Sequence, residues 1–221
     1  MTPARWFSRL SSPLFVSFAC AAISLVLFAI LADQVLAGGT REFDEFVRNS
    51  IHQHASSSLT VVMRIVTILG STPFVFAVAG VSGVRLWLGG HRRRAVLLAA
   101  TVGGGYLLMH ILKVAFHRQR PEPFFDTPLP GSYSFPSGHA LISFCFYGAA
   151  AALITAREKR PWVRALVWAA ALIMVLAIGV SRIYLGVHHA SDILAGYLAA
   201  AFWITGIAIG YRRLRRPEGR S

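Results

Sequence analysis

Apolar residues follow one another in long uninterrupted runs along most of this chain, and the charged residues are collected between the runs. Polar positions do not alternate with apolar ones inside the runs, so the period-2 pattern of strands is missing. Each run is close to the roughly 20 residues that a helix needs to cross about 30 Å of hydrocarbon. The pattern predicts an all-α bundle of six transmembrane helices, over residues 14–31, 65–84, 95–112, 140–156, 165–181 and 193–211.

The composition agrees with an integral membrane protein. Of the 221 residues, 55% are hydrophobic and only 14% are charged, which is too apolar for a soluble domain of this length. A cleaved signal peptide is the alternative for the first run, but that run is longer than the roughly 7–15 apolar residues of such a segment. We therefore expect a single membrane-embedded domain over residues 1–221, with a short basic tail at about 212–221.

The net charge of +13 is distributed as a topology signal. Lys and Arg collect on the cytoplasmic side of membrane proteins, and here they occupy alternate loops. This places both termini in the cytoplasm and argues against a nucleic-acid partner, while allowing contacts with anionic membrane lipids. The basic residues are Arg5, Arg9, Arg85, Arg92, Arg93, Arg94, Arg157, Lys159, Arg160, Arg164, Arg212, Arg213, Arg215, Arg216 and Arg220.

With this topology, residues 38–58, 113–139 and 181–192 face outward. The second segment opens with Lys113 and Arg120, which are two helical turns apart and share a face if the helix continues that far. His117 joins the same stripe, and Pro121 is expected to end the helix. The alternative is that these cations only reach towards lipid headgroups.

The same segment closes with "SFPSGHA", residues 134–140. Pro136 and Gly138 predict a turn, and Ser137 is a natural N-cap for the apolar helix that follows. The unpaired N–H groups of a helix start bind anions, and His139 lies at this start. A capped helix with an interfacial histidine is the alternative, which explains the serine and the glycine better than the histidine.

The third outward segment contains His188 and Asp192, four residues apart and therefore on one helical face. At that spacing a carboxylate can accept the imidazole N–H and leave the other ring nitrogen free as a base, nucleophile or metal ligand. The neighbouring His189 points elsewhere on such a helix and is interpreted as structural.

The first outward segment has Phe43, Phe46, Val47 and Ile51 at amphipathic spacing. This indicates either an interfacial helix near the site or an ordinary surface helix.

Together the segments resemble the type-2 phosphatidic acid phosphatase superfamily of integral-membrane lipid phosphate phosphatases. The resemblance rests on Lys113 with Arg120-Pro121, on Pro136 to His139, and on Ser181-Arg182 with His188 and Asp192, three motifs in order. Arg118, which gives "RxRP", also fits. Three motifs in register are far more specific than any one of them.

The resemblance implies a role for each matched residue. His188 would attack phosphorus and form a phosphohistidine, Asp192 would orient it, and His139 would act as general acid and then general base. No cofactor is implied, and the sequence has no clustered carboxylates of the kind that Mg²⁺ or Ca²⁺ sites use. We expect a bell-shaped pH–rate profile. The phosphate oxygens would be held by Lys113, Arg120, Ser137, Gly138 and Arg182.

Other functions compete with hydrolysis. A phosphotransferase on the same scaffold is not distinguished by any residue pattern, whereas the vanadium haloperoxidases that share these motifs are soluble. A transporter or non-catalytic lipid-phosphate binder is a different class, but transporters place ionisable groups near the midplane, and here only Arg64 and His110 fall within or beside the spans.

The residues do not identify the substrate. Undecaprenyl diphosphate, phosphatidylglycerol phosphate, phosphatidic acid and lipid A phosphates all fit the pattern. A short compact chain with an outward-facing site favours the bacterial inner membrane, with the site on the periplasmic or extracellular side.

Overall fold

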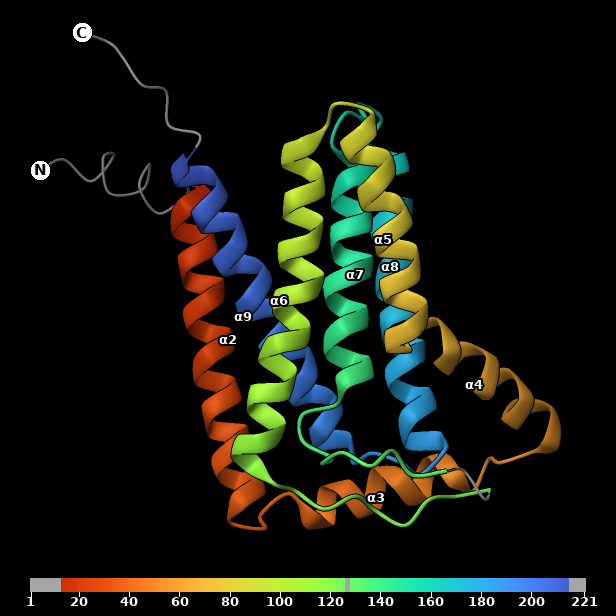
Figure 1. Ribbon diagram of the computed structural model, residues 1–221. Coiled ribbons are helices and arrows are strands. Elements are labelled where there is room, and N and C mark those ends of the chain that lie inside the picture. Colours follow the sequence, from red (N-terminus) through yellow and green to blue (C-terminus); the bar gives the residue numbers. More distant parts are fainter. Residues whose placement is uncertain (1–12, 126–127, 215–221) are drawn as a thin grey trace, which may run out of the picture.

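The computed structural model describes residues 13–125 and 128–214, and this part of the chain is helical with no strand. The predicted all-α class is therefore confirmed for these residues. The helices form an elongated bundle with one helix lying across its end (Figure 1). They are α2 (Pro13–Leu36), α3 (Arg41–His52), α4 (Ser57–Leu69), α5 (Thr72–Leu88), α6 (Arg92–Phe116), α7 (Gly138–Thr155), α8 (Pro161–Tyr184) and α9 (Ala190–Leu214).

Five of these helices, α2, α6, α7, α8 and α9, are long and apolar enough to cross a membrane by themselves. The helices α4 and α5 pass the same test only together, and they are bent by 45°. The predicted span over residues 65–84 is therefore divided between α4 and α5. The break follows from local chemistry, because Ser71 caps α5 by accepting from the N–H of Phe74 and Pro73 lacks the N–H that a continuing helix would need.

One buried apolar cluster lies where α7 packs against α6 and α9. Leu141, Ile142 and Cys145 are fully buried there and contact Leu98 and Ala200. The helix α2 packs along α9 (Figure 1). Most other large apolar side chains face outward, as expected for a protein whose solvent is hydrocarbon. The chain is a multi-pass membrane protein.

Gly196 of α9 packs directly against the first turn of α7. A Cβ atom built at this position would lie 2.8 Å from the carbonyl oxygen of Ser137 and 2.9 Å from Cβ of Ala140. Only a residue without a side chain fits there, so the backbones of the two helices touch directly. This contact lies one turn past Asp192 in α9 and at the first turn of α7.

The three segments expected to face outward lie at one end of the bundle, the lower end in Figure 1. The loops that join α5 to α6 and α7 to α8, which carry basic residues, lie at the opposite end. Arg5 and Arg9 lie outside the described residues, as do Arg215, Arg216 and Arg220 of the tail.

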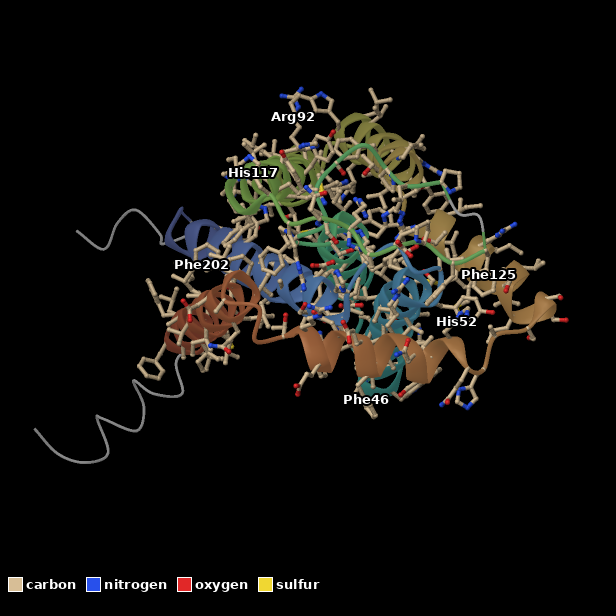
Figure 2. All side chains as sticks on the ribbon, turned by 90° about the horizontal axis from the view of Figure 1, so that it is seen from below. Phe46, His52, Arg92, His117, Phe125 and Phe202 are labelled. Atoms are coloured by element: carbon tan, nitrogen blue, oxygen red, sulfur yellow. The ribbon has the colours of Figure 1, made fainter. Side chains whose placement is uncertain are left out.

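The helix α3 crosses the lower end of the bundle (Figure 1), and its apolar side chains divide between two surroundings. Val47 and Ile51 pack against the buried cluster of Ile183 and Ile193. Phe46 is 71% exposed and points away from the bundle (Figure 2). The helix therefore has both an inward face on the protein and an outward apolar edge.

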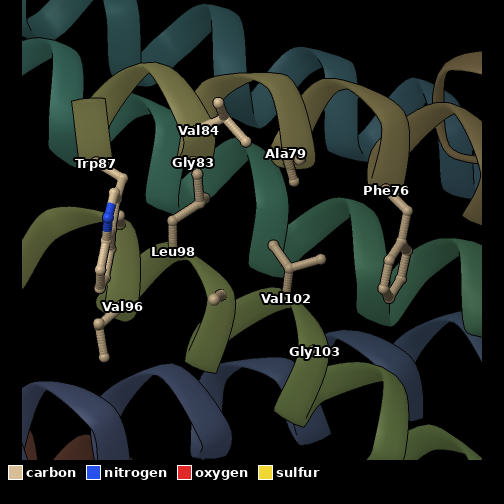
Figure 3. Close-up of a pocket in the computed structure, with 12 residues that line it drawn as sticks. Phe76, Ala79, Gly83, Val84, Trp87, Val96, Leu98, Val102 and Gly103 are labelled. Carbon is tan, nitrogen blue, oxygen red and sulfur yellow. The ribbon is translucent and has the colours of Figure 1, made fainter. Parts of the chain in front are cut away.

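An apolar groove of about 540 Å³ lies between α5 and α6 (Figure 3). Its labelled lining includes Phe76, Trp87, Leu98 and Val102, none of which is ionisable. The groove therefore offers packing space in the bilayer but no reactive group, and the candidate chemistry lies elsewhere.

Candidate active site

His188 and Asp192 face each other at the start of α9. Nδ1 of His188 lies 3.3 Å from Oδ2 of Asp192, and the two residues are 2% and 0% exposed. The predicted stacking on one helical face is wrong, because α9 begins at Ala190 and His188 lies in the turn before it. The pair forms all the same, since Asp192 also accepts from the backbone N–H of His189 and closes that turn.

The second ring nitrogen of His188 carries a lone pair. Nη1 of Arg120 lies 3.1 Å from Nε2 of His188, and a guanidinium can only donate, so Nε2 is the acceptor and Nδ1 carries the proton. Burial lowers the pKa of His188 well below its usual value, Asp192 offsets this only in part, and Arg120 and Arg182 lower it further. The imidazole is therefore neutral at physiological pH, which is the form that can act as a nucleophile.

Ser134 is a member of this cluster that the sequence analysis missed. Its side chain is fully buried, its hydroxyl donates to Oδ2 of Asp192, and it lies 3.3 Å from Nδ1 of His188. The residue opens the "SFPSGHA" stretch, but no spacing rule singled it out. It fixes the carboxylate oxygen that faces the imidazole.

Lys113 and Arg120 meet at the carbonyl oxygen of Tyr133, to which both donate. The predicted helical stripe is nevertheless wrong. The helix α6 ends at Phe116, well before Pro121, because His117 adopts a left-handed conformation with φ 49°. The chain then turns, and Arg120 comes to the site from the loop. The ring of His117 packs edge-on against Tyr133, with 4.6 Å between centroids.

Arg182 approaches the site from α8 and is only 6% exposed. Its Nη1 donates to the hydroxyl of Thr67 on α4 at 2.7 Å, whereas its buried Nε has no partner among the described residues. In the described part of the chain, Lys113, Arg120 and Arg182 form no ion pair with a carboxylate. Three largely buried positive charges that bind only neutral groups create a strong demand for an anion.

The start of α7 completes the group. Gly138 lies against α6, since a Cβ atom there would be 2.4 Å from Sδ of Met109 and 3.9 Å from Cε of Lys113. The backbone N–H of Ser137 donates to the carbonyl of Asp192 at 2.9 Å. Ser137 occupies the N-cap position, but its side chain does not cap the helix as predicted, and its buried hydroxyl has no partner among the described residues.

His139 is the second residue of α7 and is half-buried. It lies within electrostatic range of His188 and of the three cations. All eight residues selected from the sequence are thus found at the same end of the bundle, on the loops and helix ends that meet there. They are Lys113, Arg120, Ser137, Gly138, His139, Arg182, His188 and Asp192.

Arg118 and Asp44 form a second layer behind Asp192. Arg118 donates to Oδ1 of Asp192 at 2.6 Å and to Oδ2 of Asp44 at 2.8 Å. Asp44 was missed by the sequence analysis, although one signal was present. It lies three residues before Val47 and seven before Ile51, so it is a carboxylate on the buried stripe of an amphipathic helix.

A polar groove of about 550 Å³ opens beside the cations and is lined by Lys113, Arg120, Gln119 and Ser132, among others. It makes Lys113 and Arg120, two of the three cations, accessible to a ligand. Within the described ranges, no three His, Cys, Asp or Glu side chains are close enough to hold a metal ion. The positive charge of this site comes from Lys and Arg side chains.

Comparison with known proteins gives several relatives that are lipid phosphatases by name. The chain is 28% identical over 201 residues to the phosphatidylglycerophosphatase B of Bacillus subtilis, covering 88% of this chain and 98% of that protein. It is 32% identical over 136 residues to the lipid A 1-phosphatase of Rhizobium etli, covering 58% and 52%. It is 30% identical over 123 residues to the undecaprenyl-diphosphatase of Sulfolobus acidocaldarius, covering 53% and 55%.

The fold agrees with a solved structure, that of the first transmembrane PAP2 type phosphatidylglycerolphosphate phosphatase from Bacillus subtilis. The TM-score is 0.80 at 24% identity, with 90% of this chain and 98% of that chain covered. The family model described as the PAP2 superfamily matches residues 94–216, more than half of this chain. The resemblance inferred from the three motifs, and the assignment to the phosphatase enzymes, are thereby confirmed, and the chain belongs to the PAP2 superfamily.

Proposed function

We propose that this chain, acting as one membrane-embedded domain, hydrolyses a lipid phosphate or diphosphate through a phosphohistidine on His188, without a metal. The observation that carries this proposal is the imidazole of His188, held by Asp192 at Nδ1 and by Arg120 at Nε2, beside three cations that have no carboxylate partner in the described part of the chain. Phosphoryl transfer needs mainly positioning and charge stabilisation. Lys113, Arg120 and Arg182 supply that stabilisation.

In the first step, Nε2 of His188 attacks phosphorus. A P–N bond forms while the P–O bond to the lipid breaks, and His139 gives a proton to the leaving oxygen. Asp192 accepts the Nδ1–H of His188 throughout and stabilises the imidazolium as it forms. Two groups without a described partner, the hydroxyl of Ser137 and Nε of Arg182, supply further donors for the phosphate oxygens.

In the second step, His139 accepts a proton from a water molecule, which attacks phosphorus. The P–N bond breaks, inorganic phosphate leaves, and His188 returns to its neutral form. One residue thus serves as general acid and then as general base. The backbone N–H groups at the start of α7 add the positive end of a helix dipole to the same pocket.

The distribution of charge supports a site on the outer side of the bacterial inner membrane, with both termini in the cytoplasm. The first turn of α6 and the loop before α8 hold basic residues such as Arg93 and Lys159, and they lie at the end opposite the site (Figure 1). Basic loops mark the cytoplasmic face. The site is then level with the headgroups, and the acyl or prenyl tail stays in hydrocarbon.

The substrate belongs to the class named in the relatives: phosphatidylglycerol phosphate, lipid A phosphate or undecaprenyl diphosphate, with phosphatidic acid as a further member of that class. The test is phosphate release from a panel of these four lipids by the purified chain in detergent with a chelator, with His188→Ala as control. We expect release from at least one lipid and none from the variant.

The same panel separates the competing functions. Phosphate transferred to an acceptor lipid, with no free phosphate, would identify a phosphotransferase. Binding of the lipids without any turnover would identify a carrier or binder. Turnover that depends on added metal and survives His188→Ala would contradict the proposed chemistry.

A further inference from the structure

The helix α3 buries one acidic residue in an otherwise exposed stretch. Asp44 is 1% exposed, whereas its neighbours Phe43 and Glu45 face outward. Both carboxylate oxygens of Asp44 are bonded. Oδ1 accepts from the backbone N–H of Ser191 at 2.8 Å, and Oδ2 accepts from the hydroxyl of Ser191 at 2.7 Å. Burying a carboxylate costs free energy, and the hydrogen bonds that Asp44 accepts offset this cost.

The third partner of Asp44 is Arg118, whose guanidinium binds two buried carboxylates at once. Nη2 lies 2.8 Å from Oδ2 of Asp44, and Nη1 lies 2.6 Å from Oδ1 of Asp192 and 2.7 Å from the hydroxyl of Ser191. A guanidinium is a planar fork. Fixing one of its ends therefore fixes the direction in which the other end points.

The direction of Nη1 of Arg118 decides how the carboxylate of Asp192 is oriented. Oδ1 of Asp192 is held by Arg118, and this leaves Oδ2 to face Ser134 and His188. If Arg118 turned, the carboxylate would turn with it, and the oxygen that receives the Nδ1–H of His188 would move. The orientation of the His188 imidazole thus depends on the contact between Asp44 and Arg118, which reaches it through Asp192.

We propose that Asp44 is a positioning residue that fixes the pairing of Asp192 with His188 through Arg118. The seating of α3 on the end of the bundle then determines whether the reacting imidazole is correctly aimed. This inference rests on the proposed phosphohistidine chemistry of His188. It assigns to α3 a part in the reaction that none of the three motifs contains.

A purely structural role for Asp44, in which it only docks α3, makes a different prediction. Loss of docking would lower stability and would affect substrate binding and turnover together. Misorientation of Asp192 would slow the chemical step and leave substrate binding unchanged, because Asp44 belongs to none of the groups that hold the phosphate. The ratio of the effects on kcat and KM separates the two.

The experiment compares Asp44→Asn, Asp44→Glu and the control Glu42→Gln, an exposed acidic residue on the same helix. Phosphate release and the rate of phosphorylation of His188 in a single turnover are measured beside thermal unfolding in detergent. We expect Asp44→Asn to lower kcat on the order of 10- to 100-fold with KM unchanged, Asp44→Glu to recover part of that loss, and Glu42→Gln to match the unaltered chain.

A double-variant cycle tests the path through Arg118. In an Arg118→Met background, we expect Asp44→Asn to lower kcat by no more than about twofold. Losses that multiply would overturn the relay, as would an unchanged kcat in folded Asp44→Asn. If Asp44→Asn does not fold, Arg118→Lys decides: a lysine cannot bridge both carboxylates, so an unaltered kcat in that variant overturns the proposal.

The reactions of the unaltered chain and of His188→Ala distinguish failure of the positioning proposal for Asp44 from failure of the proposed function. If the unaltered chain releases no phosphate, or if His188→Ala is active, the phosphohistidine chemistry itself is wrong. If the unaltered chain is active, His188→Ala is inactive and Asp44→Asn retains its kcat, only the positioning role of Asp44 is wrong.

Discussion

A guanidinium nitrogen of Arg120 lies 3.1 Å from Nε2 of His188, on the side of the ring opposite Asp192. The proposed nucleophile is therefore held at both nitrogens in the free enzyme, by an acid residue at Nδ1 and by a cation at Nε2. For attack on phosphorus, the guanidinium must exchange the ring nitrogen for a phosphate oxygen. Arg120 then serves both to hold the ligand and to release the nucleophile.

The first prediction concerns Arg120→Lys. Arg120 also donates to the carbonyls of Ser132 and Val187, and a single ammonium cannot reproduce this fork. We expect kcat/KM for phosphate release to fall on the order of 100-fold, since one charge-assisted hydrogen bond contributes about 1.5–3 kcal/mol. Arg64→Lys is the matched control, because Arg64 donates only to the carbonyl of Phe125. Equal effects of the two substitutions would contradict the assignment.

The second prediction concerns pH. The folded state lowers the pKa of His188, so the nucleophile stays neutral well below pH 6.5, the ordinary histidine value. The acid limb of kcat/KM should therefore lie well below that pH, while the alkaline limb, loss of the proton from His139, is expected in kcat, where the bound phosphate favours that proton. The profile is measured from pH 4 to 9. An acid limb of kcat/KM near pH 6.5 would contradict a lowered pKa of His188, provided that the limb does not move with the pKa of the lipid phosphate.

The same shift predicts how stability depends on pH. Between the lowered folded value and 6.5 the unfolded chain binds more protons at His188 than the folded chain does, so stability falls as the pH decreases through this window. Above about 6.5 the contribution is complete. Unfolding temperatures in detergent at pH 5 and 7.5 measure the difference, which His188→Gln should reduce. A variant with the same pH dependence as the unaltered chain would refute this.

The third prediction concerns Ser134→Ala. The hydroxyl of Ser134 donates to the carboxylate oxygen of Asp192 that faces His188. Its loss should lower kcat about tenfold, in line with one lost hydrogen bond to a charged group, with little change in KM. Ser143→Ala provides the control, since the buried hydroxyl of Ser143 bonds only the carbonyl of Ala140 in its own helix. A change in KM without a change in kcat would show that Ser134 acts on binding instead.

The fourth prediction concerns Thr67→Val, which keeps the shape of the side chain and removes the hydroxyl that orients Arg182. Arg182 would then lose its link to α4, and we expect kcat/KM to fall severalfold. Thr205→Val serves as the control because the hydroxyl of Thr205 bonds carbonyls of its own helix. Unchanged kinetics in Thr67→Val would mean that Arg182 is positioned by packing alone.

The long helices could be predicted from hydropathy because a bilayer leaves a backbone few other ways to satisfy its hydrogen bonds. Gly70 and Pro73 interrupt the second span in the sequence, but they did not predict the bend between α4 and α5, because glycine and proline also occur in continuous membrane helices. What decides the break is the cap formed by Ser71, which depends on the local conformation. The helix α6 ends early because His117 adopts a left-handed conformation. The composition of the sequence does not predict this conformation.

The candidate site likewise contains residues that the sequence predicted and residues that it did not. Motif spacing selected the residues that would touch phosphate, because their side chains are unusual in an apolar chain. Asp44 and Ser134 act on other side chains across more than 50 positions of sequence, and contacts of that range are set by tertiary packing. Arg118 stands between the two cases: its motif context was visible, but its bridge between two carboxylates was not.

The direct contact of Gly196 with the first turn of α7 has a consequence for the reaction. In the proposed reaction, the placement of the two imidazoles would depend on this contact between main chains, one turn past Asp192 in α9. In Gly196→Ala a methyl group would meet the carbonyl oxygen of Ser137 and push the helices apart, which would disturb the proposed action of His188 and His139 on one phosphorus. Every polar group of the pocket would survive, and yet the formation and the breakdown of the phosphoenzyme would both slow.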